Sequence, residues 1–309
     1  MRTERDDSPY RLLFEVEGKP RRRGLRKVRS YVAFFENAVV IELDGVRDRY
    51  EAGDIYDIFV KEPVVEDVTS RTVELDFVEE GDANFYELEE ETFPGLAALV
   101  EQSLTREWSH ILRQWDYPVT VNWFLACCAV VQISSERNWR IFGSPPLEAR
   151  VTDDRRVLYE SWGFHNGRDL VKMLPKLLAG RAVKKWRKQQ GFDPETVLTG
   201  EDSAVERRLW AWDLQRLIWL ANLGLACQYL TKDEAFEWCL HAAAKLQPLF
   251  SGWDEFMDAY LRSYAEWADE DLTDPNSEAF CRAQIYQHYT RLPVHPWQVS
   301  WDQPLARQW

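Results

Sequence analysis

Two ionisable residues, Asp213 and Arg216, lie inside an otherwise apolar stretch of the chain. Residues three apart share one face of a helix, so the carboxylate and the guanidinium can pair. Buried ionic groups with shifted pKa values concentrate at functional sites, which makes this pair a candidate binding or catalytic pair. An internal salt bridge that locks the helix against its neighbours is the alternative, and we favour it because structural ion pairs also perturb pKa values.

Four further residues could complete a binding surface with this pair. Trp162 and Asn166 lie directly before a predicted helix, and Trp253 and Glu255 lie at the start of another. Exposed tryptophan and arginine carry much of the binding energy at protein interfaces, whereas a buried tryptophan packs a core. The candidate binding residues are therefore Asp213, Arg216, Trp162, Asn166, Trp253 and Glu255, and no catalytic residue is assigned.

A basic connection between Gly18 and Arg29 is a second candidate site. It could contact an anionic surface or a phosphate through Arg21, Arg22, Arg23, Arg26 and Lys27. Each basic residue near an anionic membrane contributes about 1 kcal/mol. A solvated run of charges that serves solubility is the alternative. We favour the alternative because the chain as a whole is acidic.

Sequence motifs for metal, nucleotide and hydrolase chemistry are absent. The five histidines are scattered without a zinc-protease spacing, and the adjacent Cys127 and Cys128 have no third ligand at a metal-like spacing. The acidic run from Asp269 to Asp274 lacks the calcium-loop spacing, so we expect a solvated helix end there. Neither a glycine-rich phosphate loop nor a Gly-x-Ser-x-Gly elbow occurs. We therefore expect no cofactor and no metal, and we favour binding over catalysis.

The composition indicates a folded, acidic protein. The 309 residues include 38 Lys and Arg against 52 Asp and Glu, a formal net charge of −14, and they include 15 Trp. This charge argues against general nucleic-acid binding, which needs cations to neutralise phosphates. No apolar run is long enough to span a bilayer, and the charged N-terminal segment is unlike a secretory signal. With five cysteines in apolar stretches, these features predict a cytoplasmic protein.

The elements that position these residues are predicted to form two regions, 1–116 and 117–309. The first reads as antiparallel strands, which form a barrel closed by one long helix from Phe93 to about Trp115. The strands are expected at 10–17, 28–36, 38–43, 54–60, 71–79 and 83–88. The fold class is therefore α+β, with a β domain followed by a mostly helical, tryptophan-rich domain.

Three consecutive helices organise the second region. The first, from about Ala204 to Leu230, is apolar on almost every side and is therefore expected to be buried. The second starts at Thr231, with Glu234 at the capping-box spacing. The third starts near Ser251, with Asp254 at the same capping-box spacing, and its apolar stripe ends at Trp267.

Further helices are expected at 119–133, 168–178 and 277–292, whereas 138–159 is expected to be mixed and 181–188 to be a charged segment. The proline-rich tail, residues 293–309, cannot be helical throughout. We expect it to lie extended over the surface, anchored by Trp297, Trp301 and Trp309.

The first region resembles the pleckstrin-homology-like barrel in the count and order of its strands and in the helix that follows them. In members of that family that bind inositol lipids, basic residues of the first connection hold the phosphates. The resemblance therefore implies the same contact for the connection between Gly18 and Arg29.

The second region resembles the bacterial family called domain of unknown function 1266, over about residues 161–268. The matching residues are Trp162-Gly163, Ala211-Trp212-Asp213 with Arg216, Ala235 to Trp238, Gln247, and Ser251-x-Trp253-x-Glu255-Phe256 with Tyr260 and Trp267. The resemblance implies a helical bacterial domain. It brings no reaction and no catalytic residue.

Three functions follow from these observations, and we favour the first. It is non-catalytic binding of another protein, by an adaptor or by an immunity-type protein that neutralises a basic toxin. The second is an enzyme with a pocket around Asp213 and Arg216. The third is docking on anionic lipid or phosphate through the basic connection.

Overall fold

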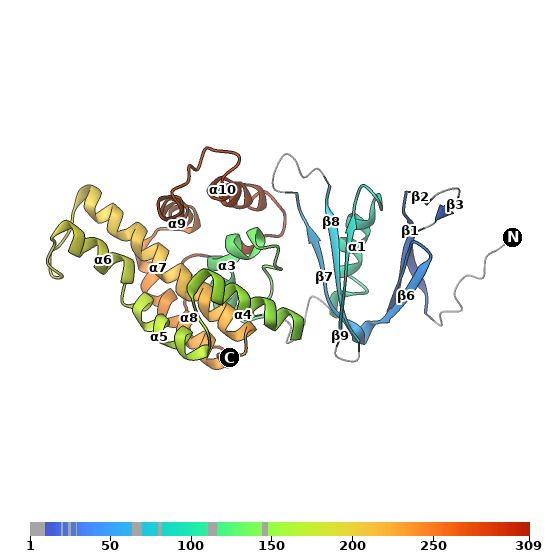
Figure 1. Cartoon of the computed structure of the whole chain (residues 1–309), viewed down its shortest axis with the longest axis horizontal. Coiled ribbons are helices and arrows are strands. Elements are labelled where there is room, and N and C mark those ends of the chain that lie inside the picture. The colour runs from blue at the N-terminus through green and yellow to red at the C-terminus, as the bar shows by residue number, and fades with distance from the viewer. Residues whose placement is uncertain are drawn as a thin grey trace. The chain divides into compact units, whose positions relative to one another are not determined.

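The computed structural model describes residues 10–19, 21–23, 26–28, 30–63, 70–79, 82–110, 116–143 and 148–309. The side chains of 21–29, 78–83 and 148–150 lie outside this description. The chain forms two compact units, Met1–Asp116 and Tyr117–Trp309 (Figure 1). The first unit contains the strands and the second contains helices, so the architecture is α+β.

Two antiparallel sheets and a short ribbon make up the first unit. The larger sheet has the order β1-β4-β5-β6, and its strands are β1 (Leu12–Glu17), β4 (Tyr31–Phe35), β5 (Ala38–Leu43) and β6 (Val46–Glu51). The smaller has the order β7-β8-β9, formed by β7 (Ile55–Lys61), β8 (Thr72–Glu79) and β9 (Asp82–Glu89). The ribbon pairs β2 (Arg21–Arg23) with β3 (Arg26–Val28).

Alternating side chains of both sheets build the core of this unit. Val32 and Phe34 of β4 and Val39 and Ile41 of β5 are buried, as strand periodicity requires. Helix α1 (Leu96–Leu104) adds Leu96, Ala97 and Val100 to the same core. All six predicted strands are present.

Three features of the first unit differ from the prediction. Among the described strands the two sheets do not join into a closed barrel. Strand β6 was missed because charged side chains occupy most of it and only Tyr50 is buried. The predicted long helix is instead α1, which ends at Leu104 in a turn, and the predicted continuation over 111–115 lies outside the described residues.

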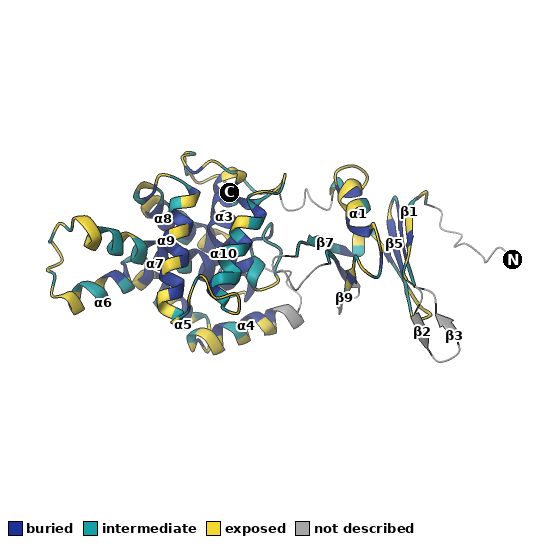
Figure 2. Cartoon of the chain, turned by 90° about the horizontal axis from the view of Figure 1, so that it is seen from above, coloured by how far each residue is buried: buried dark blue, intermediate teal, exposed yellow. Residues whose placement is uncertain are grey.

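Helices pack around α7 in the second unit (Figure 2). They are α3 (Val119–Ser134), α4 (Glu148–Trp162), α5 (Gly167–Leu178), α6 (Arg181–Gln190), α7 (Gly200–Ala226), α8 (Lys232–Leu246), α9 (Trp253–Ala268) and α10 (Glu278–Tyr289). Short 3-10 turns, η2 (Gln247–Leu249) and η3 (Pro296–Gln298), follow α8 and α10. Within the described ranges, every helix is too short or too polar to cross a lipid bilayer.

Helix α7 is buried along its second half, as its apolar sequence predicts. One polar residue there, Asn222, has specific partners. The Asn222 side chain accepts a hydrogen bond from the Gly143 backbone N–H at 3.0 Å and lies against Cys128 Sγ. The next helix starts at the predicted residue, because Thr231 and Glu234 form the capping box of α8.

The tail after α10 is held by indole rings, as predicted. Trp301 is buried with Trp123 and Trp253, and ring centroids in this group lie 4.8–5.2 Å apart. We call these three residues the buried tryptophan cluster. Each indole N–H donates to a backbone carbonyl: Trp123 to Trp301, Trp253 to Val299, and Trp301 to Phe250. Such pairing removes the cost of burying a polar N–H.

Several predictions for the helical unit were wrong in detail. Helices α4 and α6 lie where mixed and charged segments were expected. The side chain of Ser251 pairs with Glu255 rather than with Asp254, and α9 begins at Trp253. Trp267 was placed on a buried stripe but is 65% exposed.

Candidate binding surface of the helical unit

Asp213 joins α7 to the start of α6. It is fully buried, and its Oδ2 accepts a hydrogen bond from the Ala182 backbone N–H at 2.6 Å. The first N–H groups of a helix have no partner within the helix, so a carboxylate there satisfies a donor and complements the helix dipole. Gly180, which precedes α6, has φ +71° and lies so close to Trp210 that a Cβ would be 2.7 Å from that ring. Asp213 therefore acts as a cap from another helix.

The environment of Asp213 makes its charged form costly. Burial raises the pKa of Asp213 to about 6, although the Ala182 N–H and the Arg216 guanidinium oppose this shift. The Arg216 Nη1 atom lies 4.0 Å from Asp213 Oδ1, which is longer than a direct hydrogen bond. This Oδ1 has no hydrogen-bond partner among the described residues. The pair is therefore loose, and the cap is the closer contact of the carboxylate.

Arg216 lies between two indole rings. Its Cζ atom is 4.4 Å from the ring centroid of Trp162 and 4.7 Å from that of Trp212. Both distances are within the range of a cation–π interaction. The side chain is 17% exposed, and burial lowers the pKa of Arg216 to about 10 although Asp213 opposes the shift. The guanidinium stays charged at neutral pH.

The indole of Trp212 extends this stack towards solvent. Its ring centroid lies 5.5 Å from that of Trp267, and the Tyr260 and Tyr264 rings also pack on it. A second arginine, Arg282 of α10, lies with its Cζ 3.9 Å from the Tyr264 ring and donates to the Tyr260 hydroxyl at 2.8 Å. We call this group the tryptophan–arginine cluster; its members are Trp162, Trp212, Arg216, Tyr260, Tyr264, Trp267 and Arg282.

Comparison with known families assigns part of this unit. Residues 157–301 match the family model described as "Protein of unknown function (DUF1266)". The chain contains a DUF1266 domain. No curated protein and no solved structure matches the chain. The match extends past the predicted end near residue 268, and its far limit is Trp301, a member of the buried tryptophan cluster.

The DUF1266 domain brings together only some of the predicted binding residues. Asp213, Arg216 and Trp162 are neighbours, as described above. Asn166 is exposed and caps α5 by accepting from the Arg168 N–H at 2.9 Å. Trp253 belongs to the buried tryptophan cluster, and Glu255 accepts from Ser251 and pairs with Arg207 at 2.9 Å.

The other candidates lie in the first unit and in α3. The basic connection forms the β2–β3 ribbon, with Arg22 opposite Lys27 and Arg23 opposite Arg26, while the side chains of Arg21 to Lys27 lie outside the described residues. Cys127 and Cys128 are buried in α3, and burial raises the pKa of both thiols. A buried thiol with a raised pKa is a core residue rather than a nucleophile.

Five members of the cluster were not among the predicted binding residues: Trp212, Tyr260, Tyr264, Trp267 and Arg282. Tyr260 and Tyr264 are four apart on α9 and therefore share a face, which the sequence displays. Arg282 lies on a later helix, and no spacing connects it to Tyr264. Its contact could be found only from the packing of α10 against α9.

Proposed function

We propose that the DUF1266 domain of this chain is a non-catalytic protein-binding module, of the adaptor or immunity type. The observation that supports this proposal most directly is the exposure of Trp267. This residue is 65% exposed although its ring packs on that of Trp212. An exposed tryptophan on a preformed aromatic support offers a large contact area with little loss of side-chain freedom.

The composition of the tryptophan–arginine cluster supports this proposal. Tryptophan, tyrosine and arginine are the residues enriched in the energetic centres of protein interfaces. Arg216 and Arg282 are already held by aromatic rings, so binding would cost them little further ordering. Charged groups adjoin the cluster: Glu266, next to Trp267 in the chain, is exposed and pairs with the half-buried Arg208 at 3.0 Å. A polar rim around an aromatic centre is typical of interfaces.

The alternative is an enzyme with Asp213 as an acid or base. The pKa of about 6, raised by burial, would suit such a role. The carboxylate, however, is fully buried and one of its oxygens already caps α6. A group that holds two helices together is poorly placed to approach a substrate, so we favour binding.

The test is to isolate the tagged full-length protein from its source organism and to identify retained proteins by mass spectrometry. Trp267→Ala is compared with Val197→Ala, a matched control because Val197 is 87% exposed and lies outside the cluster. We expect one stoichiometric partner that is retained by the wild type and by Val197→Ala and is lost with Trp267→Ala. Equal retention by both variants, or no partner for the folded wild type, would overturn the proposal.

We also propose that the first unit is pleckstrin-homology-like. Its four-stranded and three-stranded antiparallel sheets, followed by a helix, support this proposal, as does a basic ribbon in the first long connection. Docking on anionic lipid through Arg21, Arg22 and Arg23 is the associated function. Sedimentation with anionic vesicles should fall several-fold when all three are changed to Ala; unchanged sedimentation would exclude it.

A further inference from the structure

Helices α5 and α6 carry a strong positive charge in this acidic protein. Residues 167–190 contain eight Lys and Arg and one Asp, a net charge of +7 within a chain whose total is −14. Seven of these cations are exposed: Arg168, Lys172, Lys176, Arg181, Lys184, Lys185 and Lys188. We call these seven residues the cationic face.

The spacing of the cationic face arranges its charges in two rows. Arg168, Lys172 and Lys176 are four apart on α5, so they lie along one side of that helix at intervals of about 6 Å. On α6, Arg181 is followed at the third, fourth and seventh positions by lysine, which is again one side of a helix. The opposite sides carry the packing, because Leu170, Leu174 and Val183 are buried.

The ion pairs of the cationic face can be compared with those elsewhere in the described part of the chain. Within the described residues, none of the seven forms an ion pair with a carboxylate, although the chain has an excess of acidic residues. Elsewhere arginines find such partners readily, for example Arg71 with Glu62 and Arg262 with Asp258. The cationic face therefore holds uncompensated charge that a partner could neutralise.

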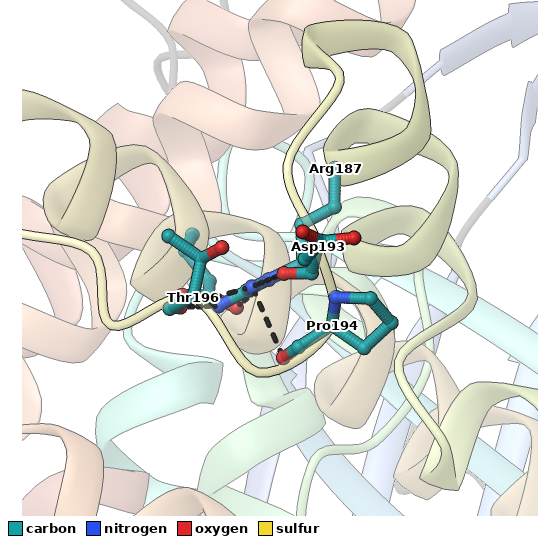
Figure 3. A network of polar contacts seen from close by, with 5 residues as sticks. Arg187, Asp193, Pro194 and Thr196 are labelled. Carbon is teal, nitrogen blue, oxygen red and sulfur yellow. Dashed lines mark hydrogen bonds and ion pairs between the residues drawn. The ribbon is translucent and has the colours of Figure 1, made fainter.

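An acidic edge limits the size of that partner. The loop after α6 and the start of α7 carry Asp193, Glu195, Glu201 and Asp202, all exposed, with no Lys or Arg between 191 and 206. Arg187 fixes this loop beside α6. Its guanidinium donates to the carbonyls of Asp193, Pro194 and Thr196 and pairs with Glu206 at 2.7 Å (Figure 3).

This edge selects among polyanions. A long nucleic acid or an anionic bilayer that covers the cationic face would extend beyond Lys188 towards these carboxylates. Like charges repel over about 8 Å at physiological salt, so the acidic edge disfavours such a partner. A short anionic segment would stop before them. The prevalence of lysine suits such a target, because an ammonium does not require the planar geometry of a bidentate partner.

We propose that the cationic face on α5 and α6 binds a short acidic segment of a partner protein. The face and the tryptophan–arginine cluster share no residue, so the two proposals can fail independently. Binding here is electrostatic, and its affinity falls as salt rises.

The test uses fluorescence anisotropy with the full-length protein and a labelled octaglutamate peptide at low and at physiological salt. We expect Lys184→Glu/Lys185→Glu to weaken binding about tenfold or more at low salt. The control, Arg106→Glu/Arg291→Glu, makes the same change in net charge at two exposed positions elsewhere and is expected to weaken binding less than about threefold. Lys172→Glu/Lys176→Glu, on α5, serves as a second variant should the first not fold.

Three outcomes would overturn the proposal. The first is no binding of octaglutamate by the wild type at low salt, and the second is an equal loss in the test and control variants. The third is tighter binding of a short DNA duplex or of anionic vesicles that is lost in the same variants, which would assign the face to another polyanion. Trp267→Ala is expected to leave peptide binding unchanged, which separates this result from that of the tryptophan–arginine cluster.

Discussion

The helical unit contains two groups of tryptophans that are built differently. In the buried tryptophan cluster, Trp123, Trp253 and Trp301 are all below 9% exposed and each indole N–H donates to a backbone carbonyl. In the tryptophan–arginine cluster, the indoles of Trp162 and Trp212 hold the Arg216 guanidinium. The exposed fraction rises from 7% at Trp212 to 65% at Trp267. Satisfied polar groups and full burial identify the first as core.

The exposed fraction of each indole separates stabilising tryptophans from binding ones. A core indole contributes its burial energy in the free protein, so that energy cannot be used again for binding. Trp267 keeps most of its surface in water and can still bury it against a partner. We therefore expect variants of the two groups to separate, with stability lost in one and binding lost in the other.

The largest effect is expected for Trp301→Ala. This change removes ring packing against Trp123, Trp253 and Phe256 and leaves the Trp123 region open to a cavity, so the free energy of unfolding should fall by about 3–5 kcal/mol. Denaturant titration measures it, with Trp301→Phe as a control that keeps part of the packing. A loss below about 1 kcal/mol would show that the tail does not close the core.

A smaller effect is expected from the charge on Asp213. Burial raises the pKa of Asp213 to about 6 from an ordinary value of 3.8, so the folded state holds a proton over a range where the unfolded state has released it. The contribution to stability is present below about pH 4 and is lost as the pH rises through 6. A pKa that differs by one between the folded and unfolded states corresponds to about 1.4 kcal/mol, so Asp213 should contribute a loss of about 3 kcal/mol between these limits.

The comparison variant for this pH dependence is Asp213→Asn. The amide oxygen can still accept from the Ala182 N–H but has no charge to bury. The unfolding free energy of the wild type should therefore fall relative to that of Asp213→Asn as the pH rises from 4 to 7. The measurement is denaturant titration at several pH values. A constant difference across this range would contradict the buried position of the carboxylate.

Local signals in the sequence predicted much of this fold. The capping box at Thr231, the start of α10 after Ser277 and the strand alternation of the first unit all depend on residues a few positions apart. The tail anchors Trp297 and Trp301 were also predictable, because large indoles between prolines have no other means of avoiding water.

The remaining features depend on contacts that no local pattern encodes. The partner of Asp213 is a backbone N–H on another helix, 31 residues earlier. Helix α6 was missed because Val183 is its one buried residue and it therefore lacks an apolar stripe. Trp267 follows the spacing of the α9 stripe, yet it lies in the last turn of that helix, where the described neighbours cover only part of it.

The most direct test of the division between the two groups is the unfolding free energy of Trp267→Ala, measured beside its retention of the partner. Loss of the stacking on Trp212 and Tyr264 should cost about 1 kcal/mol or less, while the partner is lost. A loss of about 3 kcal/mol or more, of the size expected for Trp301→Ala, with the partner retained would place Trp267 in the core and contradict the proposed binding role.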